Sequence, residues 1–371
     1  MLFRGVRKRT RFLASLLYFL VMLGIVVLAV ANQHGYPKHA MDTRCYPCLC
    51  TNGKVPGTLR LESCWLASTL RFKYLNLAKR GISEIAPKAL HPLGQDLLIL
   101  SLASNDLKHL PQKVFEGLHQ TRLLDLSHCM LEDLRREHFE GLGKVGSLSL
   151  SGNHIKQLPP DVFKPMLQLK QILLGGERRN VGDDELMVLG NLLSDLPPGI
   201  FKDLRWLVRI DVSQNRLASL PRGVFESLPR LAQLELRDNL LQELPSEAFR
   251  NLPSLQNLSL QNNVLRSIAP DAFQAVPSLQ RLDLAKNQLS GILDPTALRG
   301  LSNLRHLDLS QNHLRGIQTG ALALKNLHSL DLSSNDLRNL SWTEVLQNLT
   351  SLEVLRLADL SLPLVPRLPP S

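Results

Sequence analysis

Four cysteines near the amino terminus are the residues whose types and spacing best suit specific chemistry: Cys45, Cys48, Cys50 and Cys64. A Cys-x2-Cys pair is a common half of a zinc site, whereas four cysteines in a secreted chain form two disulfides. No matching second pair follows, so the zinc interpretation is the weaker one. Spacing alone leaves all three possible disulfide pairings open.

Catalytic motifs are missing from the sequence. The 11 histidines are scattered, and there is no His-Glu-x-x-His, Gly-x-Ser-x-Gly or glycine-rich phosphate loop. His306 lies two residues before Asp308 in an expected strand, where a solvated histidine is a simpler interpretation than a general base. We therefore expect no enzyme activity, no cofactor and no metal site.

Three Asn-x-Ser/Thr triplets are acceptors for N-glycosylation if the chain is exported, and they begin at Asn257, Asn339 and Asn348. Asn257 falls on the face of an expected strand, so it is the weakest of the three candidates for modification. Residues 1–31 supply the export argument. Their basic start and the apolar run Phe12–Ala31 end in Ala-x-Ala, as signal peptides do.

Two outcomes remain open for this leader. Cleavage after it predicts a secreted protein, and retention predicts a cell-surface protein, because an apolar run of this length at ~1.5 Å per residue can span a bilayer. Membrane contact is expected only in the second case. Both outcomes place the rest of the chain outside the cytosol, where disulfides form.

The elements that carry these residues are repeats. Asparagines recur at a constant interval at Asn191, Asn215, Asn239, Asn263 and Asn287, and the series continues at Asn312 and Asn335. Leu234-Glu235-Leu236 alternates with period two, which predicts a strand with the leucines on one face and Glu235 on the other. No single repeat can bury its apolar face, so we expect the repeats to stack into a solenoid.

The pattern L-x-x-L-x-L-x-x-N-x-L at this period resembles extracellular leucine-rich repeat proteins of the typical class, which includes chondroadherin, Slit and Toll-type ectodomains. The resemblance implies an α/β solenoid: a horseshoe with a parallel β-sheet on its concave face and an N-terminal disulfide cap. It also implies the pairs Cys45–Cys50 and Cys48–Cys64. A protein ligand on the concave face is the function that it implies.

The expected organisation is a leader at 1–31, a cysteine cap at 32–70, about twelve repeats at 71–360 and a Pro-rich tail at 361–371. Relatives usually carry a second cap after the last repeat, so we expect either a shortened form of a longer protein or an end that a partner covers.

One phenylalanine per repeat is expected to form a core column: Phe115, Phe139, Phe163, Phe201, Phe225, Phe249 and Phe273.

Two irregularities interrupt the pattern. Cys129 stands at an asparagine position, where the family accepts a buried cysteine; an exposed thiol there would instead form an intermolecular bridge. The step from Asn153 to Asn191 is longer than the others, and removing the segment Glu177–Gly190 restores the constant interval. The insert is either a protruding recognition loop or an insertion without function.

Composition argues against a nucleic-acid partner. Five of the ten net positive charges lie within residues 1–11, the rest form no clustered basic stripe, and aromatic residues make up only 5% of the chain. The residue between the two strand leucines faces the concave side, which predicts an acidic column: Asp211, Glu235, Asp283, Asp308 and Asp331.

Adjacent strands lie about 4.8 Å apart, and two like charges at that distance repel by about 0.9 kcal/mol in bulk water. A cationic region of a protein ligand would relieve this repulsion. The alternative is that Leu-Asp-Leu is simply the family's favoured strand, with Arg209 and Arg281 beside Asp211 and Asp283.

We expect an extracellular protein-binding module, with a structural matrix protein as the rival; ligand identity and oligomeric state stay open.

Deleting Glu177–Gly190 is expected to leave the fold intact or to stabilise it, because the repeat pattern closes without this segment. Closing a loop of this length costs only about 2 kcal/mol. A thermal melt of the deletion variant checks this prediction. A large drop in the midpoint would mean that the insert packs into the stack.

Overall fold

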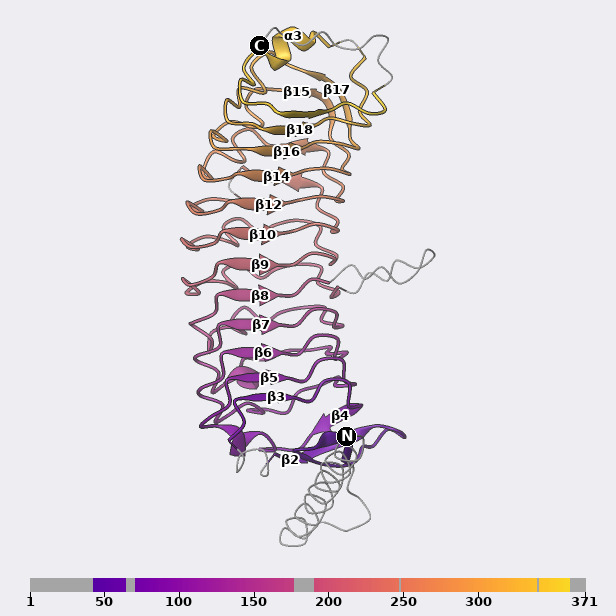
Figure 1. Ribbon diagram of the computed structural model, residues 1–371, viewed down its shortest axis with the longest axis vertical. Coiled ribbons are helices and arrows are strands. Elements are labelled where there is room, and N and C mark those ends of the chain that lie inside the picture. Colours follow the sequence, from indigo (N-terminus) through magenta and orange to yellow (C-terminus); the bar gives the residue numbers. More distant parts are fainter. Residues whose placement is uncertain (1–42, 65–70, 177–189, 247, 339, 361–371) are drawn as a thin grey trace, which may run out of the picture.

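The structure is a computed structural model that describes residues 43–64, 71–176, 190–246, 248–338 and 340–360. Successive turns of the chain stack along one long axis, with the cysteine-rich segment at one end and helix α3 at the other (Figure 1). This is the predicted leucine-rich repeat solenoid, and the fold prediction is confirmed.

One twelve-stranded parallel sheet runs the length of the stack, and its strands follow one another in chain order. Each strand has three residues, and the middle one points into the core. Neighbouring strands pair without a shift of register, so each outward position forms a column across the sheet. The strands are β3 (Tyr74–Asn76), β5 (Ile99–Ser101), β6 (Leu123–Asp125), β7 (Ser147–Ser149), β8 (Gln171–Leu173), β9 (Arg209–Asp211), β10 (Gln233–Glu235), β12 (Asn257–Ser259), β14 (Arg281–Asp283), β16 (His306–Asp308), β18 (Ser329–Asp331) and β19 (Val354–Arg356).

The returning, convex side is built mainly from turns. It also carries the short paired strands β11 (Glu243–Leu244) with β13 (Ser267–Ile268) and β15 (Ser290–Leu293) with β17 (His313–Ile317). Helical turns are η2 (His91–Leu93), η3 (Arg136–Phe139) and α3 (Trp342–Leu346).

The predicted phenylalanine column lies beneath this convex side. All seven rings are fully buried, and successive rings stack with centroids 5.9–6.5 Å apart where they pair.

The amino-terminal end is closed by η1 (Thr43–Cys45), β1 (Leu49–Asn52) and β2 (Leu59–Ser63), which form a small sheet with β4 (Ile82–Ile85). Disulfides join Cys45 to Cys50 and Cys48 to Cys64, so the predicted pairing is confirmed. Leu59 and Leu61 of β2 are fully buried against the first repeat. The cap therefore covers an apolar end that would otherwise face water.

A ladder of buried asparagine side chains ties the turns together. The amide nitrogen of Asn263 donates to the carbonyls of Leu236 (3.1 Å) and Leu260 (3.0 Å), and its amide oxygen accepts from the backbone N–H of Leu241 (3.1 Å). Each asparagine thus satisfies backbone groups of its own turn and of the turn before it. Buried backbone groups need such partners, and the ladder supplies them where the chain leaves the strand.

The ladder also closes across the long repeat. The amide of Asn191 donates to the carbonyl of Leu174 at 2.7 Å, 17 residues away, where other repeats span three residues. The extra residues between Leu174 and Asn191 equal the predicted insert Glu177–Gly190 in number. Strand β8 still pairs directly with β9, so the sheet continues past it. A Cβ at Gly190 would lie only 1.5 Å from the carbonyl oxygen of Gln214, which explains why glycine stands where the chain rejoins the stack.

Cys129 takes the asparagine position of its turn and is fully buried. Its Sγ donates to the carbonyl of Leu102 at 3.1 Å. Burial raises the pKa of the thiol to about 12, so it stays protonated and unreactive at neutral pH. Cys129 is therefore the buried cysteine that was expected, and its sulfur is not accessible for an intermolecular bridge.

Several sequence-based expectations lie outside the described residues: the leader at 1–31, insert residues 177–189, Asn339 and the tail at 361–371. Among the described residues, no helix has the length and apolar character needed to cross a membrane.

Replacing Asn263 with alanine is expected to lower the free energy of unfolding by about 3 kcal/mol, because each buried backbone group left without a partner costs about 1–3 kcal/mol. Asn257→Ala is the matched control, since Asn257 lies on the sheet surface outside the ladder. Denaturant unfolding of both variants tests the claim. Equal stabilities of the two variants would show that the asparagine ladder does not stabilise the fold.

Candidate ligand-binding site on the concave face

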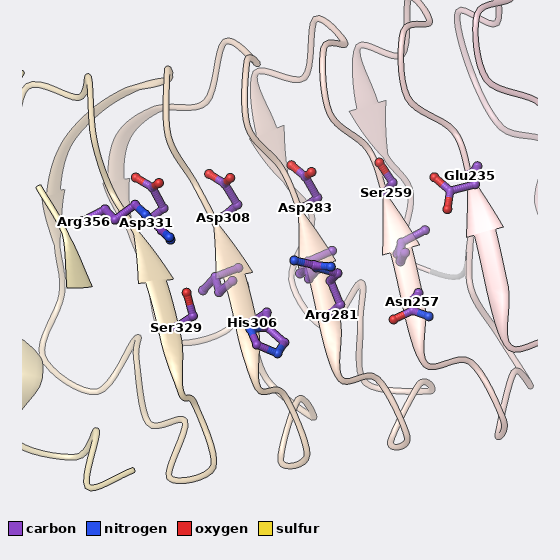
Figure 2. A pocket seen from close by; sticks show the side chains of 13 residues that line it. Glu235, Asn257, Ser259, Arg281, Asp283, His306, Asp308, Ser329, Asp331 and Arg356 are labelled. Atoms are coloured by element: carbon purple, nitrogen blue, oxygen red, sulfur yellow. The ribbon is translucent and has the colours of Figure 1, made fainter. Parts of the chain in front are cut away.

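A polar hollow of about 390 Å³ lies on the concave face of the carboxy-terminal half of the sheet. Side chains of strands β10 to β19 line it, and their labelled members form two rows across the strands (Figure 2). One row contains Glu235, Ser259, Asp283, Asp308, Asp331 and Arg356, and the other contains Asn257, Arg281, His306 and Ser329.

Asp283, Asp308 and Asp331 occupy the last position of the neighbouring strands β14, β16 and β18 and pair in register; we call them the acidic row. All three are half-buried. Figure 2 shows their carboxylates pointing the same way along the strand ends. The three residues thus lie side by side, as the predicted column requires.

The shared direction has a local cause. One carboxylate oxygen of each residue accepts the backbone N–H two residues later: from Ala285 at 3.1 Å, from Ser310 at 2.9 Å and from Ser333 at 3.0 Å. Aspartate commonly makes this bond where a chain turns. The same bond forms at Asp125 and Asp211.

Aspartate at this position therefore has a structural role in the turn. This agrees with the alternative interpretation, in which Leu-Asp-Leu is part of the repeat pattern. The turn bond uses one carboxylate oxygen of each residue. The turn holds the carboxylate in a fixed orientation without neutralising its charge.

Asp211 and Glu235 differ from the acidic row. Asp211 is only 8% exposed, accepts from the Ser213 hydroxyl at 2.6 Å and pairs with Arg209 at 3.6 Å, so it offers little surface to a partner. The pKa of Glu235 is raised by burial and then by the charge of Asp211. Of the five predicted contact residues, Asp211 is therefore the buried one, and burial disfavours the charged form of Glu235, which leaves the acidic row as the charged part of the column.

Positive groups lie beside the row. Arg281 and Arg356 line the hollow with four carboxylates, which leaves a formal charge of −2. The pKa of His306 is lowered by burial and then by the charge of Arg281, so the imidazole is neutral at neutral pH. The hollow is accordingly acidic at neutral pH. Among the described residues, no group of three or more His, Cys, Asp or Glu side chains could hold a metal ion.

Two exposed apolar features of the surface were not predicted from the sequence. Tyr74, Ile99 and Leu123 lie side by side at the first outward position of β3, β5 and β6, and Tyr74 is 53% exposed. The predicted column used only the second outward position of each strand. Trp206 is 46% exposed, and the Arg230 guanidinium lies 4.1 Å from its ring centroid. That contact joins neighbouring repeats, so the repeat period could have found it.

The structure predicts different outcomes for two substitutions at Asp308. Asp308→Ala removes the turn bond and is expected to cost about 1 kcal/mol of unfolding free energy. Asp308→Ser keeps an oxygen acceptor, creates no Asn-x-Ser triplet and should stay within about 0.5 kcal/mol of the wild type. Denaturant unfolding separates the two. Equal losses would mean that charge, rather than the turn bond, stabilises this position.

The repeat pattern is that of a known family. The model described as "Leucine rich repeat" matches residues 71–131, 124–178, 184–241, 229–289, 253–314, 291–337 and 302–359. Keratocan of Mus musculus is 30% identical over 111 residues, which are 29% of this chain and 30% of keratocan. Leucine-rich repeat-containing protein 3 of Danio rerio is 39% identical over 110 residues, 29% of this chain and 40% of that protein. The matches therefore span less than half of these relatives.

Solved structures agree on the fold. A complex of latrophilin 3, Unc5D and the repeat domain of FLRT2 contains a chain with 26% identity and a TM-score of 0.58, covering 76% of this chain and 82% of that one. The Drosophila Toll–Spatzle complex contains another, with 24% identity and a TM-score of 0.57, covering 76% and 41%. With matches from residue 71 to residue 359 and a continuous stack of repeats, this chain belongs to the leucine-rich repeat family.

Proposed function

We propose that this chain is an extracellular recognition protein that binds a cationic segment of a protein ligand on its concave face. The contact groups are the carboxylates of the acidic row, Asp283, Asp308 and Asp331. The observation that carries the proposal is their placement: three carboxylates on adjacent strands, in register, each oriented by its own turn.

The energetics favour a cationic partner. Carboxylates on neighbouring strands, about 4.8 Å apart, repel one another, and lysine or arginine side chains that bind between them relieve the repulsion. Because each turn already orders its carboxylate, a partner does not have to immobilise these side chains on binding. The neutral His306 adds no opposing charge at neutral pH.

An extracellular location is supported by the two disulfides of the cap, because disulfides persist in oxidising compartments. The apolar leader at residues 12–31 supports export, either as a cleaved signal peptide or, in the alternative, as an anchor that holds the protein at the cell surface. The likeness to a repeat domain solved with latrophilin 3 and Unc5D supports binding to a protein.

The rival function, assembly of an extracellular matrix, makes a different physical prediction. A recognition module forms a discrete complex of fixed stoichiometry, whereas an assembly protein associates into growing multimers. Sedimentation of purified residues 32–371 with a captured ligand separates the two.

The proposal predicts the behaviour of the double variant Asp308→Ser/Asp331→Ser, which keeps a side-chain oxygen for each turn, removes two charges and creates no Asn-x-Ser triplet. Screening wild type and variant in parallel against immobilised extracellular domains should find a ligand that associates roughly tenfold more slowly with the variant. The dependence of its association rate on salt should also be weaker.

A matched control removes two charges elsewhere. Asp271 and Asp336 are ion-paired with Arg299 and Arg338 outside the twelve-stranded sheet, so Asp271→Asn/Asp336→Asn should bind as the wild type does. If every ligand binds both double variants equally, the concave carboxylates are not the contact.

A further inference from the structure

One side chain in the hollow is unlike its neighbours. Asn257 is the first residue of β12, is half-buried and lines the hollow beside Arg281, with which it pairs in register (Figure 2). In the described part of the chain, no hydrogen bond engages its side-chain amide. The ladder residue Asn263, six positions later, uses its amide fully. Asn257 is therefore not a structural asparagine.

Ser259 is the second difference. Between Asp211 and Asp331 the last strand position is acidic in every repeat except this one. The hydroxyl of Ser259 makes no hydrogen bond to the described residues, whereas the aspartates of the acidic row bond to their own turns. This repeat thus departs from its neighbours at the two positions that an Asn-x-Ser acceptor requires.

We propose that Asn257 carries an N-linked glycan in a fraction of the exported protein and that this glycan covers the acidic row. The inference rests on the proposed function, since it needs export and a binding site in the hollow. It adds a modification that divides the protein into an open form and a covered form.

The chemistry requires a lipid-linked diphosphate oligosaccharide as donor. The bond between C1 of the first sugar and the phosphate oxygen breaks, and a bond from C1 to Nδ2 of Asn257 forms. Nδ2 loses one proton, and the lipid diphosphate leaves.

The fold sets when this transfer can occur. In the finished sheet, β12 is paired on one side with β10 and on the other with β14. An enclosed strand cannot enter a transferase site, so transfer must precede the closing of these repeats. Folding and transfer therefore compete, which leaves both forms among the secreted molecules.

The position of Asn257 makes the covered form inactive toward a ligand. Glu235 and Asp283 belong to the two strands that flank β12, about 4.8 Å to either side. A branched sugar attached between them fills the space that a cationic segment would enter. The carboxylates keep their turn bonds, so the fold is the same in both forms.

Occupancy is measured on protein secreted by cultured animal cells. Enzymatic removal of N-glycans in H₂¹⁸O converts each modified asparagine to a labelled aspartate, which peptide mass spectrometry locates. We expect partial labelling at Asn257, no labelling there in Asn257→Gln or Ser259→Ala, and retained labelling in Ser259→Thr. Asn348, half-buried just beyond α3, reports passage through the same machinery.

The outcomes are distinguishable. Labelling at Asn348 with none at Asn257 overturns the inference and leaves the proposed function standing. Failure of the chain to leave the cytosol, with neither site labelled, overturns both. Two variants that remove the acceptor in different ways guard against a folding defect in either one.

The second arm measures access to the hollow with a decalysine peptide as the probe. Asn257→Gln and Ser259→Ala should bind it about fivefold more tightly at low salt than glycosylated wild type that a lectin retains and whose occupancy at Asn257 is verified on a separate sample. Equal affinities would show that the glycan does not cover the acidic row.

Discussion

The structure depends on how a stacked chain satisfies its backbone where it turns out of the sheet. Those N–H and C=O groups are buried between repeats, and an unpaired one costs about 1–3 kcal/mol. A side-chain amide offers donors and an acceptor on a short stem, and at Asn263 it bonds to two turns at once. Because each turn is tied to the one before it, the strands stay in register over twelve repeats.

Because neighbouring strands pair in register, side chains at equal strand positions form columns, and these columns make up the concave surface. The acidic row exists because aspartate completes the turn after β14, β16 and β18, and the sheet then brings these carboxylates together. Their structural and binding roles do not compete, since one oxygen serves the turn while the charge remains. At Asp211 a serine hydroxyl and Arg209 add further bonds, and burial removes that carboxylate from the surface.

The constant interval between the asparagines and the alternation of the strand leucines were sufficient to predict the solenoid, its strands and the phenylalanine column. They suffice because each repeat depends only on its neighbours. The disulfide pairing required the family resemblance, since spacing admits three solutions. The turn bonds of the aspartates were not predicted, because they depend on backbone geometry after the strand. The apolar group of Tyr74, Ile99 and Leu123 was missed because its members lie one repeat apart in the sequence and the predicted column used only the second outward position of each strand.

Zero-length carbodiimide cross-linking of a decalysine peptide to the Asn257→Gln protein tests the central claim most directly. The reaction joins a lysine amine to a carboxylate only when the two are in contact, and peptide mapping then identifies the carboxylate. We expect cross-links concentrated at Asp308 and Asp331. Cross-links spread evenly over exposed acids outside the sheet, such as Asp271 and Asp336, would contradict a binding site on the concave face.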